Sequence, residues 1–202
     1  MKPVSVDRGD QLVPARARRT TVVFQGGAGT VVADHWNPDG SRGALVMLHG
    51  GGQTRHSWDR AAALLGVLDW QVFTVDSRGH GDSQWAAGGD YSPDAFVGDL
   101  SGVVDQIGDL ARVGVPPVLI GASLGGVTAL MAEGESPGLA RALVLVDVVS
   151  REGIEEFRQL IPASQVVDVA GATHMVAGDD NGVFVTHMTG FLDALPPAAG
   201  RR

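Results

Sequence analysis

Gly121-Ala122-Ser123-Leu124-Gly125 follows an apolar run and opens a segment with helical character. A G-x-S-x-G sequence between a strand and a helix is typical of a nucleophile elbow, a tight turn that presents its serine to a substrate. The serine of such a turn adopts an unfavourable φ/ψ combination, which only small neighbouring residues tolerate. Because Gly, Ala and Ser are common in this chain, a glycine-rich turn without chemistry explains these five residues equally well. Two further segments favour the elbow.

A glycine-rich sequence earlier in the chain, His49-Gly50-Gly51-Gly52, also follows an apolar run. Acyl transfer places negative charge on the carbonyl oxygen of the substrate, and preorganised N–H donors aimed at that oxygen stabilise the transition state. We expect the N–H of Leu124 to be one donor and that of Gly51, with Gly52 as the alternate, to be the second. His49 is interpreted as part of the scaffold of this loop. A flexible glycine loop without function is the alternative.

A histidine late in the chain, His174, follows another apolar run and three small residues. A serine hydroxyl needs a general base to become a nucleophile, and imidazole has a suitable pKa. The position of His174 after Ser123 agrees with the order serine, acid, histidine in which such sites are encoded. The other histidines precede the serine, except His187, which falls on the polar side of a terminal helix. We therefore expect His174 to be the base; a solvated loop histidine is the alternative.

Together with a charged glycine-rich loop, these motifs resemble the α/β-hydrolase superfamily over residues 20–195. The stretches that carry the resemblance are His49-Gly50-Gly51-Gly52, Asp76-Ser77-Arg78-Gly79-His80-Gly81-Asp82-Ser83, Gly121-Ala122-Ser123-Leu124-Gly125-Gly126 and Gly171-Ala172-Thr173-His174. The charged loop is similar to that of the epoxide-hydrolase and esterase branch, where the elbow residue decides the chemistry. Aspartate there forms an alkyl-enzyme ester and serine an acyl-enzyme, so the resemblance implies acyl transfer by Ser123. The charged loop itself is interpreted as scaffold.

Strand and helix patterns alternate along the chain, which indicates an α/β domain. Residues 20–25 and 30–36 predict a β-hairpin, and Ser92 and Pro93 predict a helix start. Short buried strands are predicted at Ala44–Leu48, Gln71–Val75, Pro117–Ile120, Ala142–Val146 and Gln165–Val169. The expected fold is a mostly parallel, doubly wound sheet of about seven strands with helices on both faces. We expect one domain over residues 20–195, a loosely ordered leader at 1–19 and a tail at 196–202.

Composition excludes several classes of protein. The net charge of −8 argues against a nucleic-acid partner, and the chain contains no cysteine for a disulfide scaffold. No apolar run is long enough for a membrane span, and the N-terminal residues lack the apolar core of a secretory signal. We therefore expect a cytoplasmic protein. Only one of the 15 basic residues is lysine, which suggests a GC-rich bacterial genome.

The second half of the chain is shorter than the resemblance predicts. Relatives usually continue after the sixth strand into a helical cap and a further strand that precedes the catalytic acid, and this chain has no room for either. Asp147, at the end of the predicted strand Ala142–Val146, is our candidate acid, although it could instead cap the next helix or face water. An exposed sheet edge at the shortened end would favour a homodimer.

The expected function is hydrolysis of small carboxylic esters in an open site without a cap. Ser123 attacks the ester, His174 transfers the proton and Asp147 orients the imidazole. Trp85, Tyr91 and Met175 are candidates for lining the acyl pocket, and no cofactor or metal is implied. Two alternatives stay open: a catalytically weak or inactive remnant or engineered minimal scaffold, and a cofactor-free perhydrolase of the haloperoxidase kind.

Overall fold

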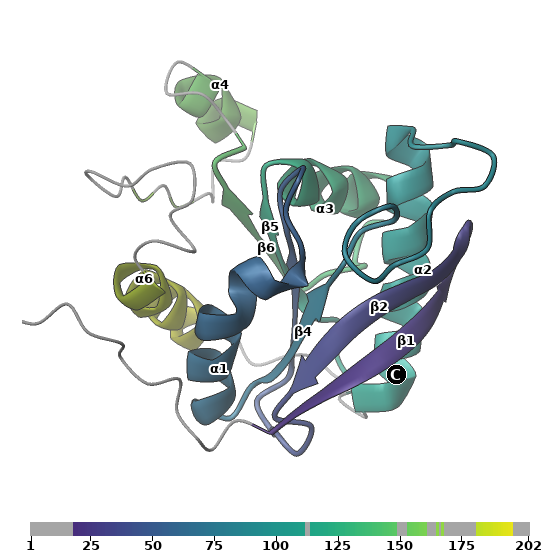
Figure 1. Ribbon diagram of the computed structural model, residues 1–202. Helices are drawn as coiled ribbons and strands as arrows, with labels where there is room; N and C mark the ends of the chain where they lie inside the picture. The colour runs from purple at the N-terminus through teal and green to yellow at the C-terminus, as the bar shows by residue number, and fades with distance from the viewer. Residues whose placement is uncertain are drawn as a thin grey trace, which may run out of the picture.

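The computed structural model describes residues 18–111, 114–148, 153–160, 165, 167 and 181–195 (Figure 1). Within these residues one sheet of six strands has the order β1-β2-β4-β3-β5-β6. The strands are β1 (Arg19–Gly26), β2 (Gly29–Trp36), β3 (Ala44–Leu48), β4 (Gln71–Val75), β5 (Val118–Ala122) and β6 (Ala142–Val146). The helices are η1 (Arg55–Trp58), α1 (Asp59–Val67), α2 (Pro93–Ala111), α3 (Leu124–Glu135), α4 (Gly153–Leu160) and α6 (Asn181–Ala194).

The sheet combines an antiparallel hairpin with a parallel part. β1 and β2 pair in a register that joins Gly26 to Gly29 across the turn, and β2 pairs antiparallel with β4. β4, β3, β5 and β6 are parallel to one another. Their carboxyl ends therefore meet at one edge of the sheet, where open α/β sheets bind their ligands.

Helices cover both faces of the sheet (Figure 1). α2 and α3 pack on one face, over a core that includes Phe73, Leu119 and Ile107. α1 and α6 pack side by side on the other, over a core that includes Met47 and Trp58. Because both faces are covered, β3 and β4 are buried along their whole length, which explains why β3 is wholly apolar and β4 mainly so. The two polar residues of β4, Gln71 and Thr74, are buried with hydrogen-bond partners.

The fold class predicted from the sequence is confirmed. The hairpin and the strands predicted at 44–48, 71–75 and 142–146 are present, and β5 lies one to two residues further along than predicted. The strand predicted at 165–169 falls on residues of which the structure describes only 165 and 167. The predicted start of α2 is present as well, because the Ser92 hydroxyl accepts a hydrogen bond from the Ala95 N–H at 3.3 Å.

Both chain ends lie mostly outside the described residues. Of the leader predicted at 1–19, the structure describes only residues 18 and 19. Arg19 is already the first residue of β1. The predicted tail at 196–202 is not described. Within the described part of the chain, no helix is both long enough and apolar enough to span a lipid bilayer.

Candidate active site

Ser123 occupies the turn between β5 and α3. Its backbone has φ 46° and ψ −112°, in the left-handed half of φ/ψ space that L-residues rarely adopt. The Ser123 N–H donates to the carbonyl of Val146 at 3.0 Å, and the Val127 N–H donates to the Ser123 carbonyl at 2.9 Å. The turn is therefore fixed from both sides, by β6 and by the first turn of α3. The strained conformation expected of a nucleophile elbow is present.

Glycines surround Ser123 because the chain segments there are in close contact. A Cβ on Gly121 would come within 2.4 Å of the backbone of Gly125, and a Cβ on Gly125 within 2.5 Å of the Leu48 carbonyl oxygen. On Gly126, a Cβ would meet the side chain of Val148 at 2.3 Å. These contacts join β5, the elbow helix and the end of β3 in one tightly packed unit. The sequence G-x-S-x-G-G is thus dictated by packing as well as by the turn.

The glycine loop after β3 lies beside the elbow. A Cβ placed on Gly50 would stand 3.5 Å from the Cβ of Ser123. Gly51 and Gly52 are exposed, with open space where their side chains would be. Among the described residues, the N–H groups of Gly51 and Leu124 have no hydrogen-bond partner, whereas the Gly52 N–H donates to His80 Nε2 at 3.3 Å. Of the two alternates in this loop, Gly51 is the one whose N–H has no partner in the described part of the chain.

His49 is fully buried beneath this loop. Its Nε2 accepts a hydrogen bond from the Ser77 N–H at 3.0 Å, and its Nδ1 lies 2.8 Å from the Gly50 carbonyl oxygen. Burial lowers the pKa of this imidazole, so the ring stays neutral. His49 therefore connects the glycine loop to the loop after β4, as a scaffold residue does.

Asp147 directly follows β6. In the register of β5 and β6, Ala122 pairs with Val146, so Ser123 and Asp147 leave the sheet at the same level. Asp147 is exposed and has φ 53°, a left-handed conformation that aspartate tolerates better than most residues. The candidate acid thus lies at the sheet edge predicted for it, one strand from the serine.

The four remaining site predictions, His174, Met175, Trp85 and Tyr91, have different outcomes. His174 and Met175 lie outside the described residues. Trp85 is 74% exposed. The Tyr91 ring covers Gly79, and its hydroxyl accepts a hydrogen bond from the Ala86 N–H at 3.1 Å. Through these contacts Tyr91 stabilises its own loop. That Trp85, Tyr91 and Met175 line the acyl pocket stays a prediction.

The charged loop after β4 is organised by one buried carboxylate, Asp76. It accepts hydrogen bonds from the Arg55 N–H at 2.6 Å and the Asp82 N–H at 3.0 Å, and it forms an ion pair with the Arg55 guanidinium. Arg55 also pairs with Asp82 at 2.7 Å and with Asp34 of β2 at 3.2 Å. Arg55 is 5% exposed and both Asp34 and Asp76 are buried, so the ion pairs with these two carboxylates are shielded from solvent, whereas Asp82 lies at the surface. The interpretation of this loop as scaffold agrees with these contacts.

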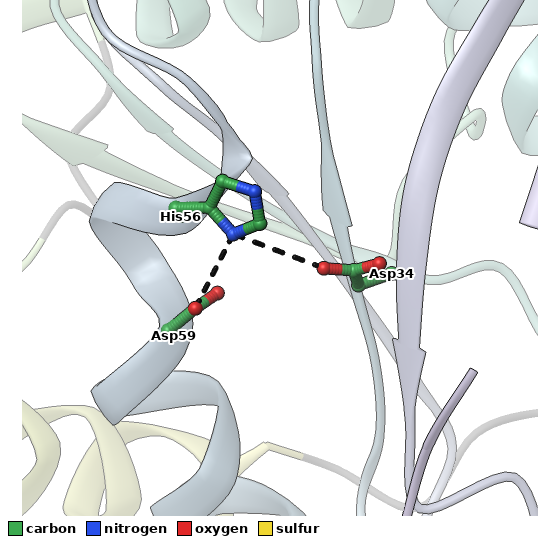
Figure 2. Close-up of side chains that lie close together, drawn as sticks. All are labelled: Asp34, His56 and Asp59. Carbon is green, nitrogen blue, oxygen red and sulfur yellow. Dashed lines mark hydrogen bonds and ion pairs between the residues drawn. The ribbon is translucent and has the colours of Figure 1, made fainter. Parts of the chain in front are cut away.

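Figure 2 shows a second cluster, formed by Asp34, His56 and Asp59. One donor atom from each lies within 4.8 Å of the others, a donor set that suits a divalent metal ion. However, Arg19 Nη1 lies 3.3 Å from Asp59 and 3.6 Å from Asp34, and Arg55 Nε lies 3.2 Å from Asp34. Two guanidinium groups already compensate these carboxylates. We therefore interpret the cluster as an ion-pair network that fixes η1 after the glycine loop.

Sequence reasoning missed Arg55, Asp34 and the contact from His80 to Gly52. Each depends on two segments that are distant in sequence, and none has a local pattern. For Arg55, a basic residue shortly after a glycine-rich loop gives no indication of burial.

A strained serine at the end of a parallel strand, glycine N–H groups beside it and an acid on the next strand define an α/β hydrolase. The chain belongs to the Hydrolase_4 family, described as serine aminopeptidase, S33, whose model matches residues 39–181. The resemblance inferred from the motifs is thereby confirmed.

Two curated relatives are similar to part of this chain. The chain is 38% identical over 121 residues to the esterase Rv0045c of Mycobacterium tuberculosis, and this alignment covers 60% of this chain and 37% of that protein. It is 38% identical over 112 residues to the sn-1-specific diacylglycerol lipase ABHD11 of Mus musculus, which is 54% of this chain and 34% of that protein. The chain thus spans about a third of the length of these relatives.

Solved structures agree with the fold. A predicted CIB-like hydrolase from Thermoplasma acidophilum superposes with a TM-score of 0.70 and 21% identity, over 87% of this chain and 98% of that one. An α/β hydrolase from Novosphingobium aromaticivorans superposes with a TM-score of 0.55 and 28% identity, over 73% of this chain and 51% of that one.

Proposed function

We propose that this chain is a serine hydrolase that cleaves small carboxylic esters through an acyl-enzyme. The observation that carries the proposal is the strained turn at Ser123, φ 46° and ψ −112°, packed against the glycine loop whose Gly51 N–H is free among the described residues. Strain of this kind persists where surrounding packing enforces it, and it is common at active sites. The esterase and lipase named among the relatives favour an ester over other acyl substrates.

In the proposed reaction, Ser123 Oγ attacks the ester carbonyl while His174 accepts its proton. The N–H groups of Gly51 and Leu124 then donate to the oxyanion of the tetrahedral intermediate, which collapses as His174 passes the proton to the leaving alkoxide. Water attacks the acyl-enzyme by the same route and regenerates the serine. Asp147 holds His174 in the required tautomer and stabilises the imidazolium.

We further propose that the site is open and lacks a cap. Between Ser123 and His174 the described residues form α3, β6 and α4, and the sequence predicts one further short strand at 165–169. Support comes from the Thermoplasma hydrolase, because nearly all of that chain superposes on this one. An uncapped site excludes water poorly and binds little of the acyl group, so we expect small activated esters to be the best substrates.

The test is hydrolysis of p-nitrophenyl acetate by the wild type, Ser123→Ala and the matched control Ser136→Ala, whose serine is exposed at the end of α3. We expect Ser123→Ala to lose at least about 10³-fold in kcat and Ser136→Ala to keep the wild-type rate, because only Ser123 forms the acyl-enzyme. A fluorophosphonate probe should label Ser123 alone. Equal rates for the wild type and Ser123→Ala would contradict the proposal.

Asp147 is tested separately. Asp147→Asn keeps the size of the side chain and removes the charge that stabilises the imidazolium, so we expect kcat to fall by about 10²- to 10⁴-fold. The control is Asp109→Asn, at an exposed position of α2. An unchanged kcat in Asp147→Asn would assign the acid to another residue while leaving Ser123 as the nucleophile.

A further inference from the structure

Two histidines join the glycine loop to the loop after β4, one from each side. His49, in the glycine loop, accepts the Ser77 N–H through Nε2 at 3.0 Å. His80, in the loop after β4, accepts the Gly52 N–H through Nε2 at 3.3 Å. The two rings lie 5.0 Å apart, centroid to centroid, at an angle of 53°. The loops thus exchange one imidazole–amide hydrogen bond in each direction.

These contacts fix the tautomer of both rings. A backbone N–H can only donate, so each Nε2 must be an unprotonated acceptor. The remaining proton is then on Nδ1, which has a carbonyl acceptor in both cases: Gly50 at 2.8 Å from His49 and Arg78 at 3.0 Å from His80. Each ring therefore bridges an N–H of the opposite loop to a carbonyl of its own loop.

We propose that His80 is a positioning residue for the oxyanion hole. By accepting the Gly52 N–H, it fixes the backbone after Gly51 and leaves the Gly51 N–H as the donor for the substrate oxygen. This inference rests on the proposed function, because it assigns His80 a part in the same reaction. His80 touches no reacting atom and acts only through the loop.

The first peptide of the glycine loop is held from within, because the Gly50 carbonyl accepts the Gln53 N–H at 3.1 Å and lies 2.8 Å from His49 Nδ1. The next peptide, between Gly51 and Gly52, donates its N–H to His80. Gly51 and Gly52 are exposed, Gly52 has φ 74°, and a Cβ on either residue would find no atom within 4 Å. Glycine has the largest conformational entropy of any residue, so without the contact from His80 the Gly51–Gly52 peptide would move more and the adjoining Gly51 N–H would be fixed from one side only. A donor misplaced by about 1 Å costs up to about 10²-fold in rate.

The test compares two substitutions of His80. In His80→Gln the Oε1 atom can replace Nε2 as the acceptor of the Gly52 N–H, whereas His80→Leu removes the acceptor. We expect His80→Leu to lower kcat for p-nitrophenyl acetate about 10- to 100-fold with KM changed less than about twofold, and His80→Gln to stay within about threefold of the wild type. The control is His187→Ala, an exposed position on α6.

A transition-state analogue separates positioning from general damage to the fold. The affinity for a trifluoromethyl ketone should fall in His80→Leu by the same factor as kcat/KM, because both depend on the oxyanion donors. A wild-type kcat in His80→Leu, or equal losses in His80→Leu and His80→Gln, would overturn the inference.

A spectroscopic measurement on the wild type needs no activity. In ¹⁵N NMR spectra, His49 and His80 should both show the neutral Nδ1–H tautomer, and the Gly52 amide should exchange with solvent more slowly than that of Gly51. An Nε2–H tautomer at His80 would overturn the inference even if the ester is hydrolysed. If the wild type has no Ser123-dependent activity but shows these signals, the proposed function fails while the bridge between the loops stands.

Discussion

Ser123 keeps an unfavourable backbone conformation in a tightly packed turn that three nearby glycines make possible. Gly121, Gly125 and Gly126 each contact backbone or a packed side chain at a distance that a Cβ could not occupy. The free energy of the strained turn, about 1–3 kcal/mol for such a conformation, is offset by the packing of β3, β5 and α3. The conformation that presents the Ser123 hydroxyl and the packing of β3, β5 and α3 therefore depend on the same close contacts of the glycines.

A substitution at Gly125 tests this coupling. In Gly125→Ala the new methyl group would lie 2.5 Å from the Leu48 carbonyl oxygen, which is backbone and cannot move aside. We expect a loss of about 1–3 kcal/mol in the free energy of unfolding and a larger proportional loss of esterase activity, since the elbow must shift. The measurements are urea unfolding and kcat/KM.

Gly134→Ala is the matched control, because it lies in the same helix with no atom within 4 Å of the added methyl. Alanine has the higher helix propensity, so the control should be unchanged or more stable by up to about 1 kcal/mol. Equal stability of Gly125→Ala and Gly134→Ala would contradict the close packing described for the elbow.

At the scale of elements, the loops that follow the parallel strands are held together by polar groups buried between them. Arg55 in η1 contacts Asp34 of β2 and Asp76 after β4, and both carboxylates are almost fully buried. Their charges are compensated inside the protein, with Asp82 as a third partner at the surface. The contact ties η1, and with it the glycine loop, to the central strands.

Arg55→Met should therefore be strongly destabilising. The methionine fills much of the same volume but leaves Asp76 buried without its guanidinium partner and Asp34 with Arg19 at 3.6 Å. Breaking a buried pair in this way costs about 3–5 kcal/mol. Urea unfolding measures the change. The contrast is Arg18→Ala, which removes an ion pair with Asp39 whose two side chains are 71% and 76% exposed, and which should leave stability nearly unchanged. Similar effects of the two substitutions would argue against the buried network.

At the scale of the whole molecule, the parts of the fold that local pattern determines were predictable. The mainly apolar runs at 44–48, 71–75 and 142–146 gave strand bounds that agree with the structure, because strands of a sheet covered on both faces are mostly apolar. The elbow was predictable too, since its turn requires particular small residues. The bridge from His80 to Gly52 and the burial of Arg55 were not predictable, because they arise only when loops distant in sequence pack together.

The buried histidines give the folded protein a defined pH dependence. His35, 4% exposed, stacks on Phe73 at 4.0 Å and donates from Nε2 to Gln71 Oε1 at 3.1 Å, and His49 is fully buried. Burial lowers the pKa of both imidazoles below the ordinary value of 6.5. As the pH falls below 6.5, the unfolded chain therefore binds protons that the folded protein does not bind. Stability is complete above this pH and decreases below it.

Urea unfolding between pH 7.5 and 5.5 measures this effect, above the range in which carboxyl groups ordinarily titrate. We expect the free energy of unfolding to be level at the upper end and to fall below pH 6.5, by up to about 1.4 kcal/mol per pH unit for each histidine. In His35→Gln the slope should be smaller, because position 35 no longer takes up a proton on unfolding, whereas His49 still does. A stability that is constant across this range, or that rises as the pH falls, would mean that both imidazoles accept a proton in the folded state and are hydrated more than their contacts indicate.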